Sequence, residues 1–370
     1  MDLGESNNYS RGRGILMESK IYVGVDLHKT QFTTCTLIDD EVIEQGTEYP
    51  TDREGYRSFI ESTQILSDTY GRAVSLAIES TANARYFRDT MEKNGFEVTV
   101  VNTLRFKVIN LSTKKTDKND AKTLAEFLSR DILPESHLCS AESEGLRRIL
   151  KTRSLMVEDA VALKNQAHAV LLAYGTITKV AQFQSGKERS RILNSLPDNI
   201  AMVIRPIFET IEVVESQRKV LETRLRQITA NDNQVKLLLT IPGIGIVNAC
   251  TIRAYIDDID RFQDYKHFSA YCGLVPWVQA SNDTIHYGRI TKRGPQELRT
   301  ALVQCVVAMV RMEDKTSDFV LMRQYQKLKE EKSSGKAIIA TARKLSRIIY
   351  IMLKTKKPFC SGRMIREVKS

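Results

Sequence analysis

One short stretch, residues 21–30, constrains the fold of this chain more than any other. It reads Ile-Tyr-Val-Gly-Val-Asp-Leu-His-Lys-Thr, an apolar run with a carboxylate near its end. Such a run predicts a buried first strand that delivers Asp26 to the edge of a sheet. Because a lone buried carboxylate is costly, Asp26 requires a cation or hydrogen-bond donors around it.

Three later acidic residues are candidates to share such a cation. Glu79 follows an apolar run at residues 73–78, which predicts another strand end. Asp117 and Asp120 lie in a polar segment, and a helix beginning there would put both carboxylates on one face. Oxygen ligands with almost no histidine among them suit Mg²⁺ or Mn²⁺ rather than zinc. Two such ions about 4 Å apart would stabilise the attacking and leaving oxygens of a phosphoryl transfer.

Each acid also has an ordinary structural explanation. Asp117 or Asp120 would be favoured at a helix start by the helix dipole, and Glu79 would suit the surface end of a strand. Asp26 is the hardest to explain in this way, because it ends an apolar strand. For His28 the preferred interpretation is a solvent-facing side chain.

The first 140 residues alternate between strand and helix patterns. The predicted strands cover residues 25–38, 41–49, 73–78 and 96–101, with a turn at Asp39 and Asp40, and the predicted helices cover 55–66 and 85–94. This alternation predicts an α/β layer with its ligand site at the carboxyl ends of the strands. Residues 1–19 lack periodicity, so we expect disorder there, with Met17 as an alternative start.

After Pro134 the pattern becomes helical. Apolar residues recur every three or four positions from Leu146 to Tyr174, interrupted by Arg153, and a second such series runs through residues 207–228. These series predict two long helices that pair as an antiparallel coiled coil, within one chain or between chains. We expect this element to serve structure and assembly into a dimer or tetramer.

Residues 237–256 form an apolar helix pattern that is broken at Pro-Gly-Ile-Gly, residues 242–245. The break favours either a helix-hairpin-helix, in which Pro242, Gly243 and Gly245 bring backbone N–H groups to a DNA phosphate, or a simple tight turn. A polar loop at residues 278–283, a basic turn at 287–295 and an apolar helix at 296–310 are predicted next. The candidate nucleic-acid contacts in this region are Arg289, Lys292, Arg293 and Arg299.

The net charge of +10 is concentrated at the end of the chain. Residues 321–370 hold 14 Lys and Arg against three Asp and Glu. Such a block suits nucleic-acid phosphates, although a solvated basic tail is the alternative. Six cysteines without a C-x-x-C pair argue against a zinc knuckle or a disulfide framework. No apolar run approaches the roughly 20 residues of a membrane span, so we expect a cytoplasmic protein.

Several motifs occur in one order along the chain. They are Gly-Val-Asp-Leu-His-Lys at residues 24–29, Glu-Ser-Thr at 79–81, Lys-Thr-Asp-Lys-Asn-Asp-Ala at 115–121, Ile-Pro-Gly-Ile-Gly at 241–245, Gly-Leu-Val-Pro at 273–276, Ser281, and Gly-Arg-Ile-Thr-Lys-Arg-Gly at 288–294. Over residues 20–350 this ordered set resembles the DEDD transposases of the insertion-sequence one-ten family.

The resemblance implies an α/β-plus-α protein. Its parts would be an N-terminal ribonuclease H-like (RuvC-like) domain, a long coiled-coil insertion, and a mainly helical C-terminal transposase domain with a helix-hairpin-helix. With the periodicity above, the expected divisions are an extension at residues 1–19, the DEDD domain at 20–140, the coiled coil at 141–232, the transposase domain at 233–320, and a basic helix and tail at 321–370.

The resemblance also implies roles for individual residues. Ser281 would attack the DNA phosphodiester and form a covalent phosphoserine link, although Asn282 follows it where family members often have glycine. Ser269 is a weaker candidate, since it lies within a predicted buried helix. A serine hydroxyl is a weak nucleophile unaided, so the acids must be brought to it. The metal ligands would be Asp26, Glu79, Asp117 and Asp120.

Family members are similar in using a structured non-coding RNA, the bridge RNA, which pairs with donor and target DNA. Base pairing would then supply specificity, and the protein would contact backbone and shape. The expected protein is therefore a Mg²⁺-dependent transposase and site-specific recombinase that mobilises its own insertion sequence. Its expected location is the cytoplasm of a bacterium or archaeon, in association with the nucleoid.

Three other functions remain open. A Holliday-junction-type endonuclease would use the same acids but would not require Ser281. An actin-like ATPase or sugar kinase would share the first loop, but it would need Gly-rich nucleotide loops that the sequence lacks. A protein that only binds nucleic acid would use the acids structurally.

Overall fold

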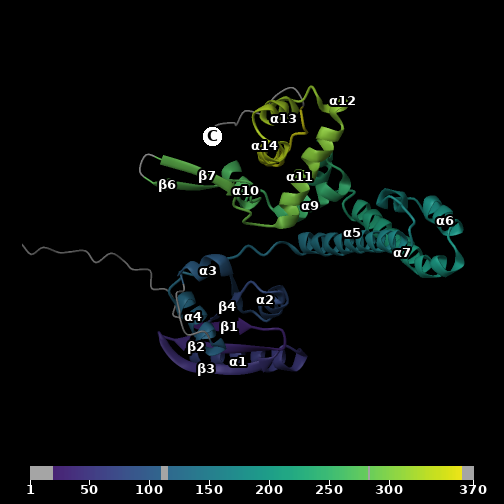
Figure 1. Ribbon diagram of the computed structural model, residues 1–370. Helices are drawn as coiled ribbons and strands as arrows, with labels where there is room; N and C mark the ends of the chain where they lie inside the picture. Colours follow the sequence, from purple (N-terminus) through teal and green to yellow (C-terminus); the bar gives the residue numbers. More distant parts are fainter. Residues whose placement is uncertain (1–19, 110–115, 282–283, 361–370) are drawn as a thin grey trace, which may run out of the picture. The chain divides into compact units, whose positions relative to one another are not determined.

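The structure is a computed structural model that describes residues 20–109, 116–281 and 284–360 (Figure 1). It divides into two compact units, Met1–Leu138 and Cys139–Ser370. The finer division into five parts stays a prediction.

The first unit is built on a five-stranded mixed sheet with the order β3-β2-β1-β4-β5. The antiparallel part comprises β1, β2 and β3, whereas β1, β4 and β5 run parallel. Their bounds are β1 Ile21–Leu27, β2 Gln31–Ile38, β3 Glu41–Pro50, β4 Val74–Glu79 and β5 Glu97–Val101. The predicted α/β layer is therefore confirmed, with its parallel strands ending at one edge.

The prediction of a single strand over residues 25–38 is wrong. β1 ends at Leu27, and the chain turns where the N–H of His28 donates to the carbonyl of Gln31 at 3.0 Å. A polar turn of three residues is too short to interrupt the strand pattern visibly. The predicted turn at Asp39 and Asp40 is confirmed, because both residues have positive φ angles, 51° and 63°, as the type I′ hairpin turn requires.

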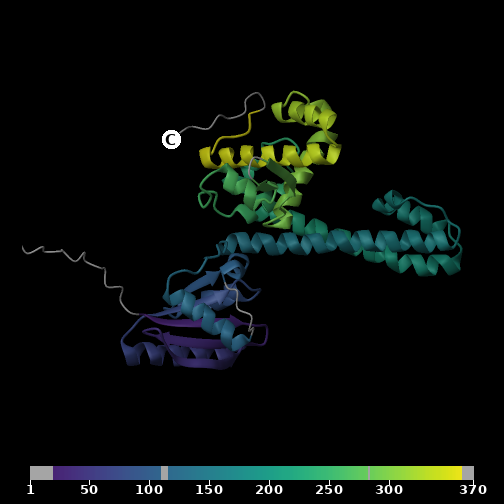
Figure 2. The same ribbon diagram turned by 60° about the vertical axis from the view of Figure 1, so that its left-hand side comes forward.

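Helices cover both faces of the sheet (Figures 1 and 2). The odd-numbered residues of β1 pack with Phe59 of α1 (Arg53–Tyr70) and Phe87 of α2 (Ala84–Lys93). The opposite face is covered by α4 (Asp117–Ser129), whose Ala121 and Ala125 pack on β2. A further helix, α3 (Thr103–Ile109), follows β5. The alternation of side chains along β1 thus assigns Asp26 to the face under α4.

Two long helices pair within the second unit. They are α5 (Ala141–Ala173) and α7 (Asp198–Ile228), and they run antiparallel because Arg153 pairs with Glu222 while Lys164 pairs with Glu215. Arg153 interrupts the apolar series because its guanidinium lies 2.8 Å from that carboxylate. The antiparallel pair within one chain is therefore confirmed, and coiled-coil packing stays a prediction. Between them lie two short helices that the sequence pattern did not predict, η1 (Val180–Gln184) and α6 (Gly186–Asn194).

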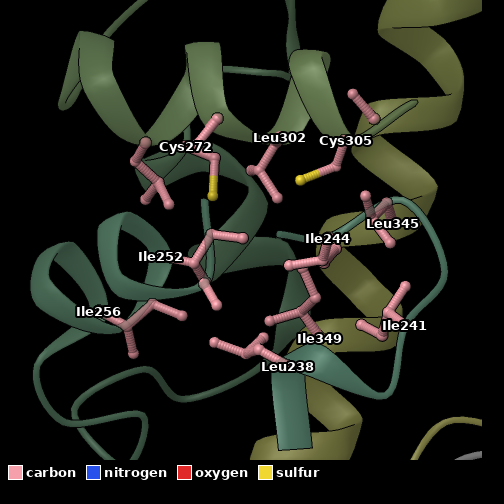
Figure 3. Packing of buried hydrophobic residues seen from close by; sticks show 14 of the residues in the cluster. Leu238, Ile241, Ile244, Ile252, Ile256, Cys272, Leu302, Cys305, Leu345 and Ile349 are labelled. Carbon is pink, nitrogen blue, oxygen red and sulfur yellow. The ribbon is translucent and has the colours of Figure 1, made fainter. Parts of the chain in front are cut away.

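The rest of the second unit forms one hydrophobic core. Figure 3 shows Leu238, Ile252, Leu302 and Leu345 pointing into it from four different helices. The helices of this part of the unit are α8 (Asn233–Leu239), α9 (Ile246–Ile256), α10 (Tyr265–Tyr271), α11 (Gln296–Arg311), α12 (Glu313–Thr316), α13 (Val320–Glu331) and α14 (Ser334–Thr355). The last helix, although strongly basic, is therefore part of a packed core over its described length.

A β-hairpin extends the second unit, formed by β6 (Pro276–Ser281) and β7 (Thr284–Ile290). The predicted polar loop at residues 278–283 is therefore wrong up to Ser281, and residues 282–283 lie outside the described part. The basic turn begins only after Ile290. A two-stranded ribbon with polar residues on it lacks the apolar alternation that marks a half-buried strand. Over the described ranges, no helix is long and apolar enough to cross a membrane.

Candidate metal centre

Asp26 and Glu79 lie next to each other at the carboxyl ends of two parallel strands. Val25 of β1 is in register with Ile78 of β4, so the following residue of each strand is an acid. Side chains alternate along a strand, and Glu79 therefore shares the α4 face with Ala77, which packs on Leu124 of α4. The register therefore places these two strand ends side by side, as the sequence predicts.

The first turn of α4 supplies the other two acids. Thr116 caps this helix by accepting a hydrogen bond from the N–H of Asn119 at 3.3 Å. The cap sets the helix start at Asp117 and leaves Asp120 in the same turn. The helix passes over β1 at Gly24, which brings this turn to the end of β1.

His28 links the strand end to the helix start. Its Nε2 lies 3.1 Å from Oδ2 of Asp26 and 3.6 Å from Oδ1 of Asp117. One ligand atom from each of these three residues lies within 4.8 Å of the others. The side chain of His28 is 49% exposed, which confirms the solvent-facing interpretation, and the exposed ring also contacts Asp26. Glu79 and Asp120 contribute no atom to this group of three.

The electrostatics of the site favour a cation. The Asp26 side chain is only 15% exposed, and this burial raises the pKa of its carboxyl group, a shift that His28 opposes and that the charges of Asp117 and Asp120 reinforce. A buried acid beside further acids is costly to ionise, and a divalent cation offsets that cost. Carboxylate oxygens with one imidazole nitrogen fit such an ion.

Polar residues around the site hold its loop in place. Asn83 donates through Nδ2 to the carbonyl of His28 at 3.0 Å and accepts through Oδ1 from the Thr81 hydroxyl at 3.1 Å. On the other side the Thr51 hydroxyl donates to the carbonyl of Lys29 at 2.6 Å. Asn83 lies in the polar segment that follows the strand ending at Glu79. A polar segment directly after a buried strand is the sequence signal that could have identified Asn83 as a residue of the site.

The two candidate serines lie in different settings. Ser281 is the last residue of β6 and pairs with Thr284 across the hairpin. Ser269 is 3% exposed in α10, with its hydroxyl 2.9 Å from that of Ser346. A hydroxyl buried between two helices is closed to a DNA phosphate in this conformation.

In the turn before α9, Gly243 packs against another helix of the protein. Its φ angle is 84°, and a Cβ atom there would lie 2.8 Å from Cγ of Met309 in α11. This contact supports the tight-turn alternative for Gly243. A Cβ atom on Gly245, in contrast, would meet nothing within 4 Å. The phosphate contacts predicted for Pro242, Gly243 and Gly245 stay a prediction.

The basic turn after β7 is held at its backbone, while its basic side chains are exposed. Arg299 of α11 donates through Nη1 to the carbonyl of Lys292 at 3.1 Å. A Cβ atom on Gly294 would lie 1.9 Å from the carbonyl oxygen of Tyr271, so the turn lies directly against α10. The exposed side chains in this region are Arg289, Lys292 and Arg293.

The mixed sheet and its acidic edge are consistent with a ribonuclease H-like DEDD domain. The chain matches a transposase model for the DEDD domain of IS110 elements over residues 23–176, and a model described as "Transposase IS116/IS110/IS902 family" over residues 235–321. The chain therefore belongs to the IS110 family of transposases and is an enzyme that acts on DNA.

Named relatives agree with this assignment. The transposase for insertion sequence element IS1111A of Coxiella burnetii is 24% identical over 96% of this chain and 95% of its own length. A probable family 20 transposase of Pseudomonas aeruginosa is 25% identical over 75% of this chain and 83% of its own. A pilin gene-inverting protein of Moraxella lacunata is 25% identical over 92% and 98% of the two chains.

Proposed function

We propose that this transposase cleaves and rejoins DNA strands to mobilise its own insertion sequence, with Ser281 as the nucleophile. The four acids would hold Mg²⁺ or Mn²⁺, which would neutralise charge on the phosphate under attack. The observation that carries the proposal is the convergence of Asp26 and Asp117 within one group of ligand atoms, although 90 residues of sequence separate them.

The covalent step balances as a transesterification. The Oγ of Ser281 bonds to phosphorus, its proton passes to a base, and the bond from phosphorus to one strand end breaks. That end takes up a proton and leaves as a free hydroxyl. Attack by the hydroxyl of another strand reverses these steps and joins that strand to the phosphate, which regenerates the serine. Rejoining therefore needs no external energy source, as suits a recombinase.

The first test looks for the covalent link. The purified protein, Mg²⁺, element-end DNA and co-expressed flanking RNA are resolved on a denaturing gel for the wild type, Ser281→Ala and Ser269→Ala. We expect a protein–DNA adduct in the wild type and in Ser269→Ala, and none in Ser281→Ala. An adduct that is lost only in Ser269→Ala would move the nucleophile to α10.

The alternative is a Holliday-junction-type, metal-dependent endonuclease that uses the same acids without serine catalysis. The same gel distinguishes it, because cleavage without an adduct in all three proteins would favour the nuclease. The name of the Moraxella relative, a pilin gene-inverting protein, favours recombination, since inversion of a DNA segment requires that cut strands be rejoined.

The proposal extends to partners. A bridge RNA would pair with donor and target DNA, so that the protein need not contact bases in order to select a site. Two duplexes must be cut together, which calls for a dimer or tetramer. Light scattering of the protein with and without its flanking RNA would test both points, since the expected result is an even-numbered assembly that includes the RNA.

A further inference from the structure

Helix α14 carries four of its five charged side chains on the side opposite the core. Its 22 residues, Ser334–Thr355, include five Lys and Arg and no Asp or Glu. The core side presents Leu345, Ile349 and Met352, each 0% exposed. At about 100° per residue, Lys336, Arg343, Arg347 and Lys354 fall within about 20° of one line along the opposite side. A helix buried on one side thus presents a row of cations on the other.

The members of this row differ in their partners. Lys354 Nζ lies 2.6 Å from Oδ1 of Asp260, so its charge is compensated. Arg347 stacks over the ring of Tyr265, with its guanidinium carbon 4.4 Å from the ring centre, which leaves the edge of the guanidinium for a ligand. Lys336 and Arg343 are exposed, and within the described residues neither has an ion-pair partner. Lys336, Arg343 and Arg347 are here called the α14 stripe.

Two acids near the other end of α14 already have partners of their own. Asp260 faces Lys354, at the far end of the helix from Lys336. Asp264 accepts hydrogen bonds from His267 beside Tyr265, and it is thus already partnered. The fifth cation of the helix, Lys344, lies off the stripe and donates to Gln324 at 2.8 Å. Three cations on a rigid helix, spanning about 16 Å at 1.5 Å per residue, form a surface complementary to regularly spaced anions.

We propose that the α14 stripe contacts backbone phosphates of the DNA duplex on which the transposase acts. The span matches about five base-pair steps of 3.4 Å. Arg347 covers one face of the Tyr265 ring, so that face is not open for stacking with an unstacked base, as single-stranded RNA would require. The inference rests on the activity of the enzyme on DNA, and it is independent of the serine step.

The test measures binding of the full chain to a 30-base-pair DNA duplex of arbitrary sequence. Fluorescence anisotropy reports the binding at several salt concentrations, with a chelator present to remove divalent ions. Lys336→Gln and Arg343→Gln should each weaken binding about fivefold near 0.1 M salt and reduce the slope of log K against log salt by about 1. The matched control Lys93→Gln, an exposed lysine of α2 on the sheet face away from the acids, should leave both quantities unchanged.

Two further measurements keep the outcome decisive. Thermal unfolding of each variant should match the wild type, because both side chains are exposed. A structured RNA of similar length is titrated in parallel. Unchanged DNA binding in both variants would overturn the proposal, and so would a loss confined to the RNA. This assay measures DNA binding and needs neither metal nor the Ser281 hydroxyl. A wrong assignment of Ser281 as the nucleophile would therefore leave its result unchanged, so the two proposals are tested separately.

Discussion

Gly24 of β1 lies directly under Ala121 of α4. A Cβ atom on Gly24 would lie 1.9 Å from the carbonyl oxygen of Ala121 and 2.5 Å from the backbone nitrogen of Ala125. The helix therefore approaches the strand as closely as a backbone can. This contact lies two residues before Asp26. It fixes the distance between the sheet and the first turn of α4, which carries Asp117 and Asp120.

Gly24→Ala should lower both stability and activity. The added methyl group meets backbone, which cannot move aside without lifting α4, so we expect a loss of about 1–3 kcal/mol in the free energy of unfolding. Urea denaturation measures it. Gly145→Ala in α5, where a Cβ atom meets nothing within 4 Å, is the matched control and should be neutral or stabilising. Equal stability of wild type and Gly24→Ala would contradict the close contact.

Asp26→Asn should separate ion binding from folding. We expect wild-type protein to gain about 1.4 kcal/mol of stability when Mg²⁺ is present at ten times its dissociation constant, and the variant to gain none. Without metal, the variant should unfold at or above the wild-type temperature, because a buried negative charge beside Asp117 is removed. Calorimetry with and without Mg²⁺ checks this. A wild-type protein that shows no response to any divalent ion would argue against a metal centre.

Asn83→Ala should weaken metal-dependent activity without disrupting the fold. The lost hydrogen bond to the carbonyl of His28 is worth about 1 kcal/mol, which corresponds to about a fivefold higher metal concentration for half-maximal cleavage. Asn94→Ala is the control, because Asn94 makes a similar bond to the carbonyl of Thr90 at 2.8 Å, at the end of α2. Identical metal dependence of Asn83→Ala and wild type would show that this bond does not position the site.

Gly243→Ala and Gly245→Ala should have opposite profiles. Gly243 combines a φ of 84° with contact to Met309, so its substitution should cost about 1 kcal/mol or more of stability. Gly245 is open, and alanine there should leave stability nearly unchanged but reduce DNA affinity if the turn contacts phosphate. Thermal unfolding and duplex binding of both variants check this. Wild-type DNA affinity in Gly245→Ala would leave only the tight-turn interpretation.

One thiol should react rapidly in the native protein. Cys360 is exposed, whereas the other five cysteines are buried. Burial raises the pKa of Cys35 to about 11 and that of Cys305 to about 12, so at pH 8 the reactive thiolate is scarce at both. A disulfide reagent should label one thiol within minutes, and all six after denaturation. Cys360→Ser should abolish the fast phase, and persistence of that phase would show that a second cysteine is accessible.

The local elements of this protein follow from its sequence. Asp26 at a strand end, the start of α4 at Asp117, the turn at Asp39 and the two long helices were all predictable, because periodicity and capping act over a few residues. The ordered motifs also identified the family. Each of these signals depends on neighbours along the chain.

Only the tertiary structure decided which residues from distant parts of the sequence lie next to each other. Only the parallel register of β1 and β4 brings Glu79 next to Asp26, and only the close crossing at Gly24 brings Asp117 within reach of His28. The hairpin whose first strand ends at Ser281, and the burial of one face of α14 that leaves its cation row on the opposite face, likewise needed the packed chain. The physical reason is that burial and long-range contact depend on the whole fold, whereas a sequence pattern records only local preference.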